Sequence, residues 1–259
     1  MSQQTDVVVV MGDRAFSSPT AIESLPLRSA AAAFAGCHSA VVVAPHPDDE
    51  SLGCGGAIAL LQQRSIPAHI LVMSDGTQSH PQSKKYPPER LKRLRERETQ
   101  TALQKLGLEP EAATFMGWGD SQIPAFGSKF FPEAVSGCRS YLRDRAPSLL
   151  FVPWQHDRHR DHRATWEIVQ SCLQTWQQPP QQLAYAVWGS EAAGLPCIPP
   201  DATGWRLDIR SVESLKRQAV MAHQSQTTDL INDDPTGFRL TPTMLTNLIQ
   251  PWETYLEVK

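Results

Sequence analysis

Two polar clusters in the chain contain the side-chain types that bind metal ions and transfer protons. The first is the segment Pro45-His-Pro-Asp-Asp-Glu50. Zinc in a catalytic site takes three protein ligands from His, Asp, Glu or Cys and keeps one position open. His46 and Asp49 can supply one nitrogen and one oxygen ligand. Adjacent aspartates do not easily point at the same atom, so one carboxylate can bind metal while the other acts as a base. A divalent cation also relieves the repulsion between the two.

The second cluster consists of the eight residues that end at His162. It contains His156, His159 and His162, with Asp157 and Asp161 between them. One histidine can complete a metal triad, and another can donate a hydrogen bond to the oxyanion of a tetrahedral intermediate. Histidines three residues apart near the start of a helix share a face. The spacing leaves open which histidine has which role.

The alternative to a metal site is a solvent-exposed acidic turn for the first cluster and a solvated histidine-rich loop for the second. The context favours the metal site, because each cluster follows an apolar segment, residues 39–44 and 149–154. Gly53, Gly55 and Gly56 also follow the first cluster, where we expect them to let the backbone turn into a helix.

The elements that must position these clusters alternate along the chain. Residues 39–44 form a continuous apolar, β-branched run, which is typical of a parallel strand buried on both faces. Further strands are predicted at 68–73, 114–117, 149–154, 183–188 and 205–209, and helices at 29–35, 57–64, 88–106, 131–145, 161–176 and 212–223. Strands separated by long helices imply right-handed crossovers and a mainly parallel sheet.

The sequence therefore predicts a Rossmann-like α/β domain with helices on both faces of a mainly parallel sheet. We expect one domain over residues 38–259, preceded by an N-terminal extension over residues 1–37. In such sheets, ligands bind beyond the carboxyl ends of the strands. The two clusters follow the first and the fourth predicted strand, so we expect them to meet at one rim of the sheet.

Several motifs together resemble the PIG-L/LmbE-like N-acetylglucosaminyl deacetylases, over about residues 39–226. The first cluster and the second, with its His-x-Asp-His pattern, carry most of the resemblance. The remaining matches are Leu52-Gly-Cys-Gly-Gly56, Arg95-x-x-Glu98, Phe115-Met-Gly-Trp-Gly-Asp120, Lys216-x-x-Ala219 and His223-Gln-Ser-Gln226.

The resemblance implies a role for each matching position. His46, Asp49 and His162 would bind Zn²⁺, and the ligand types also admit another divalent ion such as Fe²⁺. Asp48 would be the general base that activates a water molecule at the metal. The implied reaction is hydrolysis of the acetamide of an N-acetylglucosamine-type substrate.

The resemblance also implies roles around the metal. His159 would stabilise the oxyanion as a cation, and Asp161 would orient a histidine partner. Arg95 and Asp120 match positions that bind sugar hydroxyls or support the pocket. The additional His156 could compete for the third-ligand or oxyanion role.

The resemblance assigns no role to His223 or to the tryptophans near the predicted rim. We interpret His223 as a structural histidine. Trp118, Trp154 and Trp188 are expected to combine core packing with stacking on a sugar.

Two alternative functions remain at this stage. The first is an amidase that uses the same metal residues to cleave a thiol conjugate or an antibiotic precursor. The second is a non-catalytic Rossmann-like module that binds a nucleotide or sugar. No GxGxxG pattern follows the first strand, and the acidic residues there would repel phosphate, which disfavours the second alternative.

Composition restricts the partners and the location. The chain has 259 residues, a net charge of -3 and 41% hydrophobic residues, which argues for a globular enzyme and against nucleic acid as the main partner. No apolar stretch approaches the roughly 20 residues that span a membrane. Five widely spaced cysteines without a CxxC pair, and no signal-peptide pattern, favour the cytoplasm. We expect a small amino-sugar substrate and, from the resemblance, a homo-oligomer.

Overall fold

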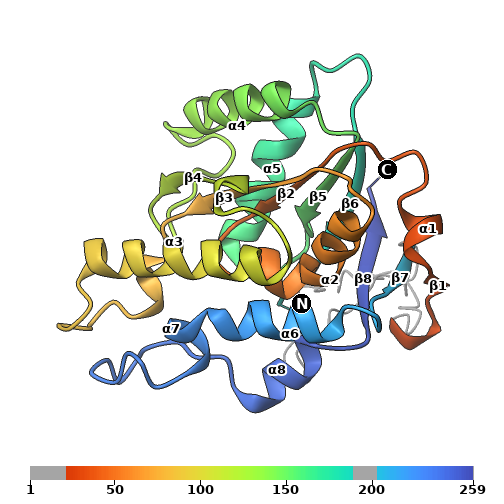
Figure 1. The fold of residues 1–259 in the computed structure, drawn as a ribbon. Helices are drawn as coiled ribbons and strands as arrows, with labels where there is room; N and C mark the ends of the chain where they lie inside the picture. Colours follow the sequence, from red (N-terminus) through yellow and green to blue (C-terminus); the bar gives the residue numbers. More distant parts are fainter. Residues whose placement is uncertain (1–21, 189–202, 259) are drawn as a thin grey trace, which may run out of the picture.

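A computed structural model describes residues 22–188 and 203–258 of the chain (Figure 1). Its centre is an eight-stranded sheet with the order β1-β7-β8-β6-β5-β2-β3-β4. Only β8 among these strands runs antiparallel to its neighbours, β6 and β7. The strands are β1 (Leu27–Arg28), β2 (Ala40–Ala44), β3 (Ala68–Ser74), β4 (Ala113–Trp118), β5 (Leu149–Pro153), β6 (Gln181–Tyr185), β7 (Gly204–Asp208) and β8 (Trp252–Glu257).

Helices cover both faces of this sheet (Figure 1). One core joins α2, α3 and α6 to one face, and a second core joins α4 and α5 to the other. This arrangement confirms the predicted fold class. The helices are α1 (Ala30–Ala33), α2 (Asp49–Gln63), α3 (Pro88–Lys105), α4 (Phe131–Arg145), α5 (Arg160–Leu173), α6 (Glu213–Ala222), α7 (Gln224–Thr227) and α8 (Pro242–Leu248).

The central strand β2 shows why its sequence is apolar throughout. Val42 packs into the core on one side of the sheet, while Val41 and Val43 pack into the core on the other. All five residues of the strand are buried. A strand with helices on both faces has no solvated side, so it cannot alternate between apolar and polar residues.

Helix α2 begins earlier than the sequence suggested. The prediction placed its start at residue 57 after a glycine-rich turn, but the helix starts at Asp49 and contains all three glycines. A Cβ atom on Gly53 would lie 2.3 Å from the ring of Tyr185, and one on Gly56 would lie 2.6 Å from Ile209. The glycines therefore allow the helix to approach its neighbours closely, and they do not form a turn.

The C-terminal part of the chain contains three elements that the sequence did not predict, α7, α8 and β8. Strand β8 lies between β6 and β7, so the last strand in the sequence fills an inner position of the sheet. Strand β6 ends at Tyr185, three residues before its predicted end.

The described part of the N-terminal extension contributes to the same sheet. Strand β1 lies within it and pairs in parallel with β7. The first 21 residues of the extension lie outside the described part, and the domain boundary at residue 38 remains a prediction. Within the described ranges, every helix is too short or too polar to cross a membrane.

Candidate metal and catalytic site

Strands β2 and β5 are parallel neighbours, and this pairing brings the two polar clusters together. The first cluster begins directly after β2, and its Asp49 is the first residue of α2. The second cluster follows β5, and its His162 lies in the first turn of α5. Both loops leave the sheet at the carboxyl ends of the strands, which is the rim where ligands bind in such folds.

One carboxylate oxygen of Asp49 contacts the rings of both His46 and His162. The Oδ2 atom of Asp49 lies 3.1 Å from Nδ1 of His46 and 3.2 Å from Nε2 of His162. The backbone N–H of His46 donates to the same oxygen at 2.9 Å. All three residues are buried. Burial acts to raise the pKa of Asp49, but the charges and hydrogen bonds of the two histidines lower it below its usual range.

The polar atoms of these residues fit a divalent cation. In the described part of the chain, Oδ1 of Asp49 is buried without a hydrogen-bond partner, and Nε2 of His46 and Nε2 of His162 face carboxylate oxygens at 3.2–3.4 Å without forming a hydrogen bond. Buried polar atoms without partners are costly and are rare in folded proteins. Imidazole nitrogens and a carboxylate oxygen are also the usual ligands of catalytic zinc. The donor types and their missing partners therefore fit a metal centre.

Nε2 of His46 faces a second set of potential ligands. It lies 3.4 Å from Oδ1 of Asp120 and 3.4 Å from Oδ2 of Asp161. Potential ligand atoms of His46, His159 and His162 lie within 4.8 Å of one another, as do those of His46, Asp120 and Asp161. His46 is common to both candidate groups found in the described residues, and neither group contains Asp49, so a metal centre is expected around the ring of His46.

Asp48 stands beside the metal residues in a strained conformation. Its φ of 135° is outside the regions that a non-glycine residue normally adopts. Its N–H donates to Oε2 of Glu50 at 3.0 Å, and Glu50 is in turn held by His223, because Oε1 of Glu50 lies 3.1 Å from Nε2 of His223. His223 is thus buried and paired, in agreement with its interpretation as a structural histidine.

Arg95 binds the same residue from the other side. Its guanidinium donates to Oδ2 of Asp48 at 3.0 Å, to the carbonyl of Gly76 at 2.8 Å and to the carbonyl of Pro47. Burial raises the pKa of Asp48 to about 7, although the charge of Arg95 acts to lower it. A carboxyl group with such a pKa can take up and release a proton near neutral pH.

His159 is the N-cap residue of α5, and its ring is held by the backbone. Nδ1 of His159 accepts from the N–H of Asp161 at 3.2 Å, so a neutral ring carries its proton on Nε2. Burial, and then the charges of His46 and His162, lower the pKa of His159. The resemblance implied a cationic His159, whereas this environment favours a neutral ring that donates from Nε2.

Asp157 is the functional residue whose role the sequence did not reveal. Its Oδ2 lies 3.1 Å from Nδ1 of His162 and accepts from the N–H of Trp188 at 3.2 Å. Its Oδ1 accepts from the N–H of His159 at 2.9 Å. Asp157 therefore stands behind His162, the position in which a carboxylate orients a metal-binding imidazole. Its location between two histidines was the available signal.

Asp161 and Asp120 face His46 from the opposite side of the site. Oδ2 of Asp161 accepts from the N–H of Ser121 at 2.7 Å. Oδ2 of Asp120 accepts from the N–H of Gln78 at 2.9 Å, which leaves its Oδ1 directed at His46. Asp161 is thus the carboxylate that contacts the ring of His46, and Asp157 is the carboxylate that contacts Nδ1 of His162.

His156 does not join the other histidines. It is exposed and its ring packs at 5.4 Å against Trp154, outside the cavity that contains the metal residues. The three tryptophans also separate. Trp188 lines that cavity, Trp154 is buried in the core, and Trp118 packs near Phe130 at 6.5 Å.

His46 and Asp49 line a cavity of about 640 Å³, a volume typical of small-molecule sites, whereas His162 contacts Asp49 without belonging to the described lining. The polar lining of this cavity includes His46, Asp48, Asp49, Gln78, Arg95, Asp120, Arg158 and His159.

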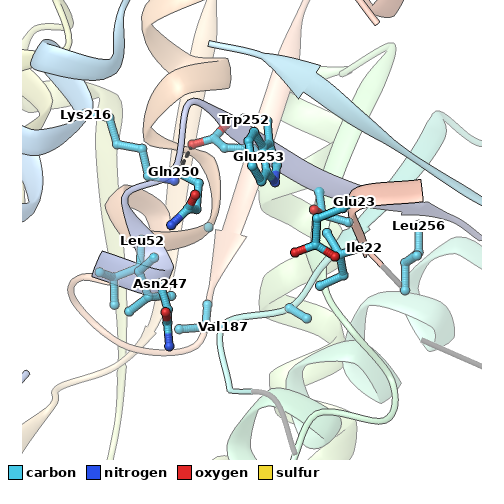
Figure 2. A pocket seen from close by; sticks show the side chains of 14 residues that line it. Ile22, Glu23, Leu52, Val187, Lys216, Asn247, Gln250, Trp252, Glu253 and Leu256 are labelled. Carbon is cyan, nitrogen blue, oxygen red and sulfur yellow. Dashed lines mark hydrogen bonds and ion pairs between the residues drawn. The ribbon is translucent and has the colours of Figure 1, made fainter. Parts of the chain in front are cut away.

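A second cavity of about 260 Å³ contains different chemistry (Figure 2). There Lys216 and Glu253 form a buried ion pair at 2.8 Å, and Glu253 also accepts from the N–H groups of Gly56 and Ala57. This pair joins α2, α6 and β8 and has a structural role. Most of the candidate catalytic residues line the larger cavity instead.

Comparisons with known proteins identify the family of the chain. The family described as "PIG-L: GlcNAc-PI de-N-acetylase" matches residues 41–173, just over half of the chain. The chain is 28% identical over 192 residues to a Bacillus anthracis protein named "Probable N-acetyl-alpha-D-glucosaminyl L-malate deacetylase 2", covering 72% of this chain and 80% of the relative. It is 24% identical over 190 residues to "Diacetylchitobiose deacetylase" of Thermococcus kodakarensis, covering 71% and 68%.

A solved structure shows the same fold. The N,N'-diacetylchitobiose deacetylase from Pyrococcus horikoshii superposes with a TM-score of 0.62 at 20% identity, and the match covers 76% of this chain and 74% of the other. At this identity the likeness concerns the fold alone, and the assignment to a family depends on the sequence match to residues 41–173.

Proposed function

The chain belongs to the PIG-L family of GlcNAc-PI de-N-acetylases, and from that premise we propose that it removes the acetyl group from an N-acetylglucosamine-type substrate. One observation carries the proposal: the buried carboxyl group of Asp48, held by Arg95, lines the same cavity as His46 and Asp49, whose atoms Nε2 and Oδ1 are buried without a hydrogen-bond partner. This combination suits hydrolysis of an amide by water and has no evident use in a module that only binds sugar.

We assign the metal ligands to His46, Asp49 and His162, with Zn²⁺ as the proposed ion. At such a site a divalent cation polarises the carbonyl group of an amide and lowers the pKa of water. The chain's contribution is to hold the three ligands rigidly. Asp49 is fixed by the N–H of His46, and His162 is supported by Asp157.

Asp48 transfers the protons of the reaction. It takes one proton from the attacking water and returns one to the amine nitrogen, so that acetate and a free amino sugar leave. Arg95 holds Oδ2 of Asp48, which keeps the carboxyl group at the edge of the cavity through both transfers. A base with a pKa near the working pH performs both transfers efficiently.

His159 and its neighbours stabilise the charge that develops on the substrate oxygen. The N–H of Asp161 occupies Nδ1 of His159, so the proton on Nε2 is available to the oxyanion. His159 lines the cavity together with His46 and Asp120. A fixed donor of this kind contributes roughly 10²–10³ in kcat in other hydrolases.

The decisive experiment measures bound metal and released acetate together. The substrates are free N-acetylglucosamine and several N-acetylglucosaminides, and the proteins are the wild type, His162→Ala and Asp48→Asn. We expect about one metal ion per chain and acetate release in the wild type. His162→Ala loses both, whereas Asp48→Asn keeps the metal and loses roughly 10²–10⁴ of the rate.

Each other outcome rejects part of the proposal. Full activity of Asp48→Asn would exclude Asp48 as the base. Metal binding without acetate from any acetamide would favour the amidase that cleaves a thiol conjugate or an antibiotic precursor. A wild-type chain that binds no divalent metal would contradict the assigned metal centre.

The proposal also includes the setting of the enzyme. We place it in the cytoplasm, as a homo-oligomer with one catalytic domain over residues 38–259. Four cysteines in the described part of the chain are free, which suits a reducing compartment. Light scattering of the purified protein tests the oligomeric state.

A further inference from the structure

The large cavity has two chemically different walls. Every charged side chain in its described lining comes from residues 46–159, the segment that also supplies two of the three proposed metal ligands, His46 and Asp49. The other wall comes from residues 187–188 and from seven residues between 226 and 248, and none of the described residues on it is charged. Its largest side chains are Trp188, Phe238, Met244 and Leu248. We refer to these four residues as the apolar wall.

The aromatic half of the apolar wall is anchored to the site. The N–H of Trp188 donates to Oδ2 of Asp157, the carboxylate that also stands behind His162. The N–H of Phe238 donates to the carbonyl of Ser79 at 2.8 Å. The two rings meet edge to face with centroids 5.6 Å apart, a preferred geometry for aromatic pairs. The rings are thus fixed relative to the metal residues.

The aliphatic half of the apolar wall belongs to α8. Pro242 occupies the first turn of this helix, and Oγ1 of Thr241 accepts from the N–H of Met244 at 3.2 Å, which fixes the start of the helix. Met244 and Leu248 are four residues apart and therefore lie on one face. Both side chains are half-buried and line the cavity.

From this wall we infer the substrate class: the N-acetylglucosamine unit carries an apolar aglycone, and the aglycone packs against Trp188, Phe238, Met244 and Leu248. The inference rests on the proposed deacetylase function. A cavity of about 640 Å³ accommodates more than one sugar ring. An anionic aglycone such as malate would lose hydration at this wall, because the cations of the described lining, Arg95 and Arg158, belong to the other wall.

A comparison of aglycones tests the inference. Acetate release is measured for free N-acetylglucosamine, for both anomers of phenyl N-acetylglucosaminide and for N-acetylglucosaminyl malate. We expect kcat/KM for the better phenyl glycoside to exceed those for the free sugar and for the malate by at least tenfold. Met244→Thr makes the wall more polar and should lower the ratio of phenyl glycoside to free sugar at least fivefold.

The matched control is Met221→Thr, because Met221 is an exposed methionine on α6 outside the cavity. It should leave the ratio unchanged. Equal rates for all aglycones, a preference for the malate, or an unchanged ratio in Met244→Thr would overturn the inference while acetate release still supported the deacetylase. Complete absence of acetate would instead contradict the proposed function.

Binding provides a readout that does not depend on turnover. Phenyl glucosaminide, the deacetylated product, should quench the fluorescence of Trp188, and glucosamine should bind at least tenfold more weakly. Trp188→Phe should remove the quenching that phenyl glucosaminide causes. Phe238→Leu keeps an apolar side chain but loses the ring pair with Trp188. It should weaken the binding of phenyl glucosaminide more than the binding of glucosamine. Equal affinities for the two ligands would contradict an apolar subsite.

Discussion

Asp157 shows at the scale of single residues how one carboxylate organises the site. It contacts the ring of His162 and accepts from the N–H groups of His159 and Trp188. It therefore links a proposed metal ligand, the proposed oxyanion donor and the apolar wall. Because it lies behind the ligand, its loss should weaken the metal site without removing any ligand.

We predict that Asp157→Asn lowers metal affinity by roughly 10–100-fold, the usual effect of losing a carboxylate behind a ligating histidine. Competition with a chromogenic chelator measures the affinity. Asp144→Asn, an exposed position on α4, is the control and should bind metal like the wild type. An unchanged affinity in Asp157→Asn would show that His162 needs no such support.

Arg95 allows a second test at this scale. Lysine keeps the charge but cannot reach the three acceptors that the guanidinium binds, two carbonyls and Asp48. We predict that Arg95→Lys lowers kcat about tenfold or more at unchanged metal content. Arg93→Lys on the same helix is exposed and should have no effect. Loss of metal in Arg95→Lys would assign Arg95 to the metal centre and not to Asp48.

Helix α2 connects the site to the sheet at the scale of secondary structure. Its first residue is Asp49, and its glycines allow the helix to pack tightly against Tyr185 and Ile209. Tyr185 is itself fixed, because its hydroxyl donates to the carbonyl of Val43 at 2.8 Å. The position of a proposed metal ligand thus depends on the absence of a methyl group at Gly53.

We predict that Gly53→Ala destabilises the protein, although alanine favours an isolated helix by about 1 kcal/mol. The added Cβ would lie 2.3 Å from a rigid ring, and overpacking of this kind costs about 1–3 kcal/mol. Gly137→Ala in α4 is the control, since its Cβ meets only the flexible end of Met116. Urea unfolding should place the midpoint of Gly53→Ala below, and that of Gly137→Ala at or above, the wild-type value.

At the scale of the whole molecule, the metal should couple the two halves of the sheet. Its proposed ligands come from the loops after β2 and β5, so an ion bound only by the folded chain stabilises the fold by mass action. Metal present at about 100 times its Kd would contribute about 2.7 kcal/mol.

We therefore predict that chelation lowers the melting temperature of the wild type and leaves that of His162→Ala unchanged. Differential scanning calorimetry with and without EDTA makes the comparison. Re-addition of Zn²⁺ should restore the melting temperature of the wild type and should not change that of His162→Ala. An equal response of both proteins to EDTA would place the stabilising ion elsewhere in the chain.

The sequence alone determined the features that depend on local patterns. The apolar run of β2, the helix over residues 131–145 and the alternation of strands and helices all follow from side-chain periodicity and local preference. The two polar clusters indicated a metal site, and the resemblance to a known family implied the role of each residue in them. Parallel topology then implied that clusters more than 100 residues apart would meet at one rim.

Only the tertiary structure decided the features that depend on contacts between distant segments. The start of α2, the inner position of β8 and the hydrogen bond from Trp188 to Asp157 all result from such contacts. The apolar wall likewise combines Trp188 with residues 238–248. Local propensity is a weak preference that packing overrides, and a side chain's partner across the fold leaves no periodic signal in its own segment.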